Sequence, residues 1–169
     1  MNPTRLTRLT VGAVDLCQRI PYGLIALLAR FAIAAVFWQS GQTKVEGLAI
    51  DPFAGTFHFG LPRLAPSTVP LFAEEYRLPL LPPELAALAA AFSEHLFPVL
   101  LLLGLATRFS ALALLGMTLV IQLFVYPGAY PTHATWAACL LLLLARGPGA
   151  CSLDWLIARH YGYHRQSRS

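Results

Sequence analysis

The sequence predicts an all-α membrane protein: a membrane four-helix bundle with an N-terminal interfacial amphipathic helix and a long outer loop. Of the 169 residues, 57% are hydrophobic and only 12% are charged, whereas an average soluble domain is roughly 45–50% apolar and about 25% charged. Four stretches approach the ~20 apolar residues that a helix needs to cross the hydrocarbon core. This composition excludes a disordered chain. The basic residues form no dense patch, which excludes a nucleic-acid-binding module.

The first predicted element is an amphipathic helix over residues 1–20. Apolar residues recur at steps of three and four, as on one face of a helix, and basic residues fall on the opposite face. A basic amphipathic helix that leads into a membrane span usually lies on the anionic leaflet. We therefore expect a surface anchor, with partner binding as the alternative. The apolar face comprises Leu6, Leu9, Ala13, Leu16 and Ile20.

Four spans follow, over residues 21–43, 83–103, 107–126 and 130–146. Backbone groups in lipid must be satisfied within the segment, so these spans are predicted to be helices. The link between the second and third spans is only a few residues long, which makes those helices antiparallel neighbours. The whole chain is therefore predicted to be one integral membrane domain.

The outer loop, residues 45–82, is too long for a bare linker. It is rich in proline and phenylalanine, and residues 69–76 are expected to form a short helix. Such a loop folds back over the mouth of the bundle, either as a lid over a site or as a plug. Residues 150–169 form the predicted cytoplasmic tail, in which His160 and His164 are expected to be solvated.

The placement of lysine and arginine predicts the orientation of the bundle. Eight arginines lie on the side of the two termini, against three basic residues on the side of the long loop. Both termini are therefore predicted to be cytoplasmic, and the 45–82 loop to lie outside the cytoplasm. The eight are Arg5, Arg8, Arg19, Arg108, Arg146, Arg159, Arg165 and Arg168, and the three are Lys44, Arg63 and Arg77.

Two ionisable residues are predicted near the middle of the membrane. Arg30 lies about ten residues, or ~15 Å, from the cytoplasmic end of its span, and Glu94 about eleven residues, or ~16 Å, from the outer end of its own. Charges at this depth are costly and are functional candidates by default. We expect Arg30 and Glu94 to form a midplane pair. Such a pair can fix helix packing, bind a polar ligand or relay a proton.

A second group of polar and aromatic residues is predicted at the outer mouth. Lys44 shares a face of the first helix with Arg30, and Gly41 lies close to that face, where it lets another backbone approach. His133 opens the fourth span, and the lid offers carboxylate and phenol partners for Lys44 or His133. The predicted mouth comprises Lys44, Glu75, Tyr76, Gln122, Tyr126, His133 and Trp136.

No complete catalytic or metal-binding pattern is present in the sequence. The cysteines Cys17, Cys139 and Cys151 have no metal or disulfide spacing, and motifs of nucleophilic or phosphate chemistry are missing. A metal or haem site on His95 and His133 would need suitably staggered helices and is not expected. We therefore expect no catalytic residues, no metal site and no enzyme activity of the chain on its own.

The order of motifs between Leu27 and Ile157 resembles the DoxX-like family of small four-span bacterial membrane proteins. The resemblance implies a multi-pass bundle in the inner membrane. Some members are membrane subunits of thiosulfate:quinone oxidoreductase, and others assemble with superoxide-detoxifying or thiol-redox proteins. Relatives with this long proline-rich loop tend to accompany small metal-stress proteins. The motifs are Ala29-Arg30-Phe31, Gly41 to Lys44, Phe72 to Tyr76, Leu80 to Leu85, Glu94 with Pro98, Gly104 to Arg108, Gln122, Tyr126-Pro127, His133 with Trp136, Gly147 to Gly149 and Ser152 to Asp154.

The resemblance favours a non-catalytic membrane subunit of a redox or stress-protection system, near the quinone pool. It is compatible with quinone as cofactor, with a redox protein as partner and with a homo-oligomer, whereas haem or metal is not expected. The alternative is a small-solute transporter or binding bundle that uses Arg30 and Glu94 for an anionic substrate. His95 departs from the family pattern, which predicts an apolar residue after Glu94.

Overall fold

The computed structural model describes residues 3–52 and 54–162, and the side chains from residue 7 onward. Residues 1–2 of the predicted anchor and residues 163–169 of the predicted tail, His164 among them, lie outside the described residues. Within the described residues, four helices are long and apolar enough to cross a membrane, as predicted: Tyr22–Gln42, Pro83–Leu103, Thr107–Val125 and Pro127–Arg146.

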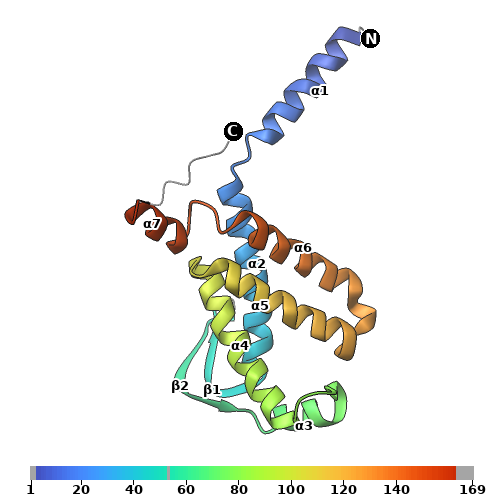
Figure 1. Ribbon diagram of the computed structural model, residues 1–169, viewed down its shortest axis with the longest axis vertical. Coiled ribbons are helices and arrows are strands. Elements are labelled where there is room, and N and C mark those ends of the chain that lie inside the picture. Colours follow the sequence, from blue (N-terminus) through green and yellow to red (C-terminus); the bar gives the residue numbers. More distant parts are fainter. Residues whose placement is uncertain (1–2, 53, 163–169) are drawn as a thin grey trace.

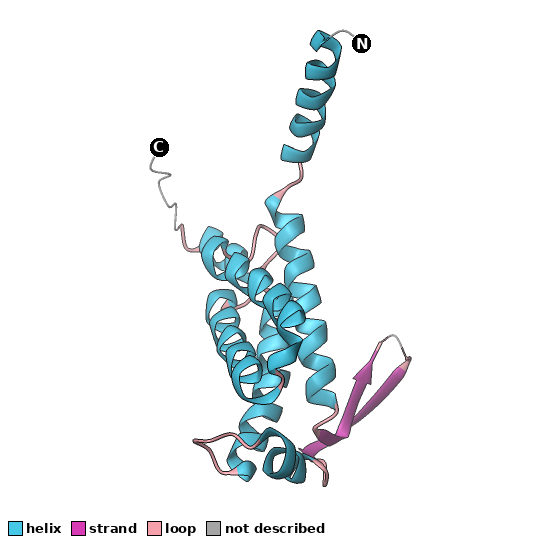
Figure 2. Cartoon of the chain, turned by 90° about the vertical axis from the view of Figure 1, so that its right-hand side faces the viewer, coloured by secondary structure: helices cyan, strands magenta, loops and turns pink. Residues whose placement is uncertain are grey.

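The four long helices form one bundle (Figures 1 and 2). Helix α2 packs against α4 and α6, α4 packs against α5, and α5 packs against α6. Apolar side chains with almost no exposed surface fill the space between them, Phe37, Leu101, Leu114, Leu140 and Leu143 among them. The mostly α-helical fold class is therefore confirmed. The bounds are α2 Tyr22–Gln42, α4 Pro83–Leu103, α5 Thr107–Val120, η2 Ile121–Val125, η3 Pro127–Ala129 and α6 Tyr130–Arg146.

The predicted N-terminal helix is present as α1, Pro3–Gln18. In both views it extends away from the bundle rather than across it (Figures 1 and 2). Its apolar side chains remain uncovered, with Leu9 72% and Leu16 67% exposed. An uncovered apolar face is what a membrane-surface helix presents to lipid, and contact with the leaflet stays a prediction.

The outer loop contains a β-hairpin that the sequence analysis did not predict. Strand β1, Val45–Asp51, pairs antiparallel with β2, Thr56–Leu64. The register shifts between Glu46 and Leu48, at Gly47, whose φ is +88°. This irregularity breaks the period-2 alternation by which a strand is recognised in sequence. The predicted outer loop therefore contains a small two-stranded sheet beside the helical bundle.

The remainder of the loop lies over the outer end of α4. Helix α3, Thr68–Leu71, and the π-helical turn η1, Phe72–Tyr76, confirm the short helix expected at residues 69–76. The carbonyl of Lys44 accepts hydrogen bonds from Thr68 Oγ1 at 2.9 Å and from the amide of Ala65 at 3.0 Å. These bonds return the chain to the end of α2 and hold η1 over the bundle mouth.

At the opposite end, helix α7, Leu153–His160, lies beside the start of α5. Its Asp154 carboxylate accepts hydrogen bonds from the backbone amides of Ala106 at 2.8 Å and Thr107 at 2.9 Å, at the start of α5. The first amides of a helix have no intrahelical partner, and a carboxylate there also complements the helix dipole. Asp154 therefore caps α5 across a gap of 47 residues in sequence.

Replacing Asp154 by alanine is expected to destabilise the protein by about 0.5–2 kcal/mol, the usual loss for a removed N-cap. Chemical unfolding in mild detergent measures the effect. Asp15→Ala is the matched control, because Asp15 is exposed on α1. Equal effects of the two substitutions would contradict the capping role.

Candidate functional site

Glu94 pairs with Lys44, and not with Arg30 as predicted. Lys44 Nζ lies 2.7 Å from Glu94 Oε2, and both side chains are about 95% buried, with 5% and 4% of their surface exposed. Lys44 Nζ also donates to Ser40 Oγ at 2.9 Å, and Ser40 Oγ donates to Glu94 Oε1 at 3.2 Å. Lys44 therefore turns back along α2 and brings its charge to the level of Glu94.

Arg30 instead holds the inner end of α4. Its guanidinium donates to the carbonyls of Leu101 at 3.5 Å and Leu102 at 3.3 Å, and to the carbonyl of Cys151. The last carbonyls of a helix lack intrahelical partners and attract a cation. Leu101 follows Glu94 by seven residues, which is about 10 Å along a helix. The predicted Arg30–Glu94 pair is therefore wrong.

The Lys44–Glu94 pair lines a cavity of about 430 Å³ between the outer halves of the four long helices, beneath η1. Most of its wall is apolar, with Phe72, Phe97, Met117 and Ile121 among the lining side chains. A few convergent polar groups on apolar walls are typical of small-molecule sites. The polar lining side chains are Ser40, Lys44, Tyr76, Ser93, Glu94, Tyr126 and His133.

The structure brings the predicted mouth residues together around this cavity. Lys44, Tyr76, Tyr126, His133 and Trp136 line it directly. The other two bind to members of this set: Glu75 Oε1 accepts a hydrogen bond from the Tyr126 hydroxyl at 2.6 Å, and Gln122 Oε1 lies 2.7 Å from His133 Nδ1. Glu94, placed by the sequence in a separate midplane pair, belongs to the same cavity.

The hydrogen bonds of Gln122 define the protonation of His133. Gln122 Nε2 donates to the carbonyl of Pro127 at 2.7 Å, so Oε1 is the amide atom that faces His133 Nδ1. An amide oxygen only accepts, and Nδ1 therefore carries the proton. The Nε2 atom of His133 is left for a ligand. It can accept a hydrogen bond when the ring is neutral and donate one when the ring is charged.

Four of the mouth residues are positioned at the cavity by two π-helical turns. The sequence contains no pattern that predicts these turns. The turn η1 carries Glu75 and Tyr76, while η2 carries Gln122 and ends at Tyr126. The amide of Tyr126 bonds to the carbonyl of Ile121 at 2.8 Å, which is the i to i+5 bond of a π turn. Such turns redirect side chains and occur often at functional sites.

The bond to Glu75 gives Tyr126 a testable titration. Hydrogen bonding to the carboxylate raises the pKa of Tyr126 above its ordinary 10, and burial adds to the rise. Because the folded-state pKa is the higher one, this contribution to stability is complete below pH 10 and is lost as pH rises through the folded value. The difference in phenolate absorbance between the wild type and Tyr126→Phe reports the titration of Tyr126 alone. It should therefore develop only above pH 10.

The control for this titration is the neighbouring carboxylate. Glu75→Gln is expected to move the Tyr126 transition to lower pH, because the charged acceptor is gone. Glu74→Gln should leave it in place, since Glu74 is exposed and is not the side chain bonded to Tyr126. A transition that Glu75→Gln leaves unmoved would contradict the assigned bond.

His95, the departure from the family pattern, belongs to a different polar cluster. Its Nδ1 donates to the carbonyl of Ala91 at 2.7 Å, so Nε2 accepts from Gln42 Nε2 at 2.9 Å. Gln42 Oε1 in turn accepts from the amide of Ile50 at 2.7 Å, and Trp38 Nε1 donates to the Ile50 carbonyl at 2.9 Å. His95 therefore helps to hold the hairpin against α2.

Gly41 makes both clusters possible. A Cβ at Gly41 would lie 2.9 Å from Cε1 of His95 and 3.1 Å from Cβ of Glu94. Only glycine leaves room for these two side chains of α4 against α2. The prediction that Gly41 permits a close helix approach is confirmed.

The fold and the site together define a small four-span helical membrane protein with a buried ion pair in a cavity beneath η1. The family model DoxX matches residues 25–127. An uncharacterized protein of Haemophilus influenzae is 31% identical over 160 residues, which cover 85% of this chain and 90% of that relative. The chain belongs to the DoxX family. No solved structure matches it significantly.

Proposed function

We propose that this DoxX family protein is a non-catalytic membrane subunit of a redox or stress-protection system, and that its outer cavity holds a quinone headgroup. The observation that supports the proposal is the buried Lys44–Glu94 pair in the wall of a cavity of about 430 Å³. The desolvation cost of a buried ion pair can offset the attraction between its charges, so a gain in stability does not by itself explain why the pair is there. Ionisable groups inside membrane spans are functional candidates by default.

The donor set and the walls of the cavity suit a quinone ring. A flat ring with carbonyl oxygens needs apolar or aromatic walls and hydrogen-bond donors, and Trp136 and Phe97 supply such walls. Tyr76 and His133 line the same cavity and carry donors or acceptors. When bound, a quinone supplies two-electron, two-proton chemistry. The protein's part is to bind the ring, to exclude water and to exchange a proton through His133 beside the Lys44–Glu94 ion pair.

In this proposal, another protein supplies the electrons that reduce the quinone. The polar side chains that line the cavity bind and exchange protons, and none of them is a cysteine. A redox protein that docks on the membrane is therefore the proposed partner. From the charge bias we propose that both termini lie in the cytoplasm, and that the cavity mouth lies on the outer side of a bacterial inner membrane. A homo-oligomer is compatible with this arrangement.

The test is to purify the protein in mild detergent from its own membrane, extract the bound lipid and record redox difference spectra. We expect quinone to copurify with the wild type. Ala113→Phe should remove it, because Ala113 lines the cavity. Leu112→Phe is the control, since the neighbouring Leu112 is 55% exposed and lies outside the lining. No quinone in the wild type, or equal amounts in both variants, would overturn the proposal.

A further inference from the structure

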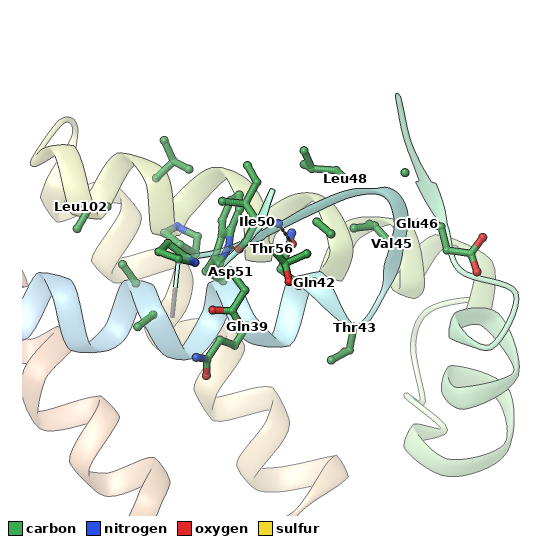
Figure 3. Close-up of a pocket in the computed structure, with 18 of the residues that line it drawn as sticks. Gln39, Gln42, Thr43, Val45, Glu46, Leu48, Ile50, Asp51, Thr56 and Leu102 are labelled. Carbon is green, nitrogen blue, oxygen red and sulfur yellow. Dashed lines mark hydrogen bonds between the residues drawn. The ribbon is translucent and has the colours of Figure 1, made fainter. Parts of the chain in front are cut away.

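A second and larger cavity, of about 750 Å³, lies between the hairpin and the helices α2 and α4. Among the residues that the structure describes, it shares no lining residue with the outer cavity. In Figure 3 its lining side chains gather between strand β1 and the ribbons of the two helices, from Leu102 at one end to Val45 and Leu48 toward the other. Residues 45–52 of the hairpin cover it.

The hairpin is held over this space along one edge. Trp38 and Gln42 bind the carbonyl and the amide of Ile50, so the free edge of β1 turns toward α2. The backbone groups of a strand edge otherwise need water or another strand. Helix side chains satisfy Ile50 in place of a third strand, and the space beside them remains open.

The helix walls of the cavity are apolar and continue into the bilayer-facing surface. Phe31 and Ala35 of α2 face Val99 and Leu102 of α4 across this space. Phe31, Val99 and Leu102 are 48%, 42% and 49% exposed. In a membrane-spanning pair of helices, side chains with this exposure contact lipid. The cavity is therefore open to the hydrocarbon region along its helix walls.

Three of the polar lining residues lie toward the end of α2. Gln39, Gln42 and Thr43 belong to the last turn and end of α2, on the outer side. Glu46 also lines this end, and Figure 3 shows its carboxylate pointing away from the other lining side chains. Asp51 and Thr56 of the hairpin line the cavity between the two ends, and the Asp51 carboxylate accepts a hydrogen bond from the amide of Ala54 at 3.0 Å. The cavity therefore combines an apolar mouth in the membrane with polar groups beside the hairpin and the end of α2, which suits a lipid chain and its ester group.

We propose that this cavity binds one acyl chain of an outer-leaflet phospholipid, with the ester region beside Gln39 and Thr43. Lipid chains are the solvent at the open mouth, and a cavity of this volume lies within the usual range for bound ligands, about 300–1,000 Å³. Ala34 and Ala35 give the cavity its depth where larger side chains would fill it. Because the two cavities share no lining residue, this inference does not depend on the proposed quinone site.

The full-length protein, reconstituted in vesicles of phosphatidylethanolamine and phosphatidylglycerol, tests the proposal. The probe is a trace phosphatidylcholine that carries a photoactivatable diazirine in mid-chain, with labelled peptides identified by mass spectrometry. We expect labelling to concentrate on β1 and the α2 wall. Ala35→Phe should reduce it about tenfold, a loss of ~1.4 kcal/mol in binding, because the larger side chain enters the cavity at a lining position. Ala32→Phe is the control, because Ala32 is exposed on α2 and lies outside the lining.

A second variant tests the same cavity from another helix, in case Ala35→Phe does not fold. Val99→Trp enters the cavity from α4 at a half-exposed position and should reduce the labelling as well, with an unchanged elution profile in detergent. Labelling spread evenly over the lipid-facing helices, or unchanged in both variants, would overturn the proposal. Loss of labelling on addition of a long-chain quinone, at constant phospholipid, would assign the cavity to an isoprenoid chain and overturn it too.

Discussion

Replacing Lys44 by methionine should destabilise the protein by about 3–5 kcal/mol, because it leaves the Glu94 carboxylate buried without its cation. Both side chains are at least 95% buried, and their charged atoms lie 2.7 Å apart. Thermal unfolding in mild detergent measures the loss. Arg63→Met is the matched control, since Arg63 is a basic residue of the same outer loop with an exposed side chain. We expect it to change stability by no more than about 0.5 kcal/mol.

A double-mutant cycle separates this pair from the one that the sequence predicted. Lys44→Met combined with Glu94→Gln should recover much of the loss, with a coupling of about 0.5–3 kcal/mol, as for contacting residues. Arg30→Met combined with Glu94→Gln should be additive, because Arg30 binds carbonyls at the inner end of α4. Coupling between Arg30 and Glu94, with none between Lys44 and Glu94, would contradict the structure.

Gly104→Ala should strongly destabilise the protein. Gly104 ends α4 with φ +67°, and a left-handed backbone costs other residues about 1–2 kcal/mol. A Cβ there would also meet Arg30 Nη1 and lie 2.5 Å from Ser152 Cβ. The arginine is held by three carbonyls and cannot easily withdraw. We expect a total loss of at least about 2 kcal/mol, or no folded protein.

The matched control is Gly116→Ala. Gly116 lies inside α5, and a Cβ there would meet nothing within 4 Å. Because alanine is the better helix former, this substitution should stabilise the protein by up to about 1 kcal/mol. Unfolding temperature and yield in detergent report both variants. Equal unfolding temperatures of the Gly104→Ala and Gly116→Ala variants would contradict the close contacts at Gly104.

The parts of the fold that rest on hydrophobic periodicity were predictable from sequence. The four spans appear close to the predicted residues, because long apolar runs and glycine or proline breaks leave few alternatives. The hairpin was not predictable in the same way. The shifted register at Gly47 disrupts its alternation, and its contacts to Trp38 and Gln42 come from another element.

The candidate site was predictable in its membership and not in its pairing. Depth counted along the helices places Arg30 and Glu94 near the same level. This depth estimate ignores that a long side chain can extend along the helix axis by more than one turn. Lys44 reaches down to Glu94, and Arg30 reaches the terminal carbonyls of α4. Every residue has a backbone carbonyl, so the sequence does not indicate which carbonyls accept hydrogen bonds from Arg30.

The π turns explain why the mouth residues assemble although they are widely spaced in sequence. Spacing along an ideal helix would send Gln122 and Tyr126 to neighbouring positions on one face. The extra residue of η2 instead lets Gln122 bind both Pro127 and His133 while Tyr126 reaches Glu75. The lid thus makes its contact through a local irregularity, for which single-sequence patterns have no marker.

The central claim is that the outer cavity with Lys44 and Glu94 binds a quinone headgroup. Titration of the purified protein with a short-chain benzoquinone, followed by quenching of Trp136 fluorescence in a Trp38→Phe and Trp155→Phe background, tests it most directly, because Trp136 lines the cavity. We predict saturable quenching that weakens about tenfold in Ala113→Phe, a loss of ~1.4 kcal/mol, and stays unchanged in Leu112→Phe. Quenching that rises linearly with quinone, or is equal in both variants, would contradict the account.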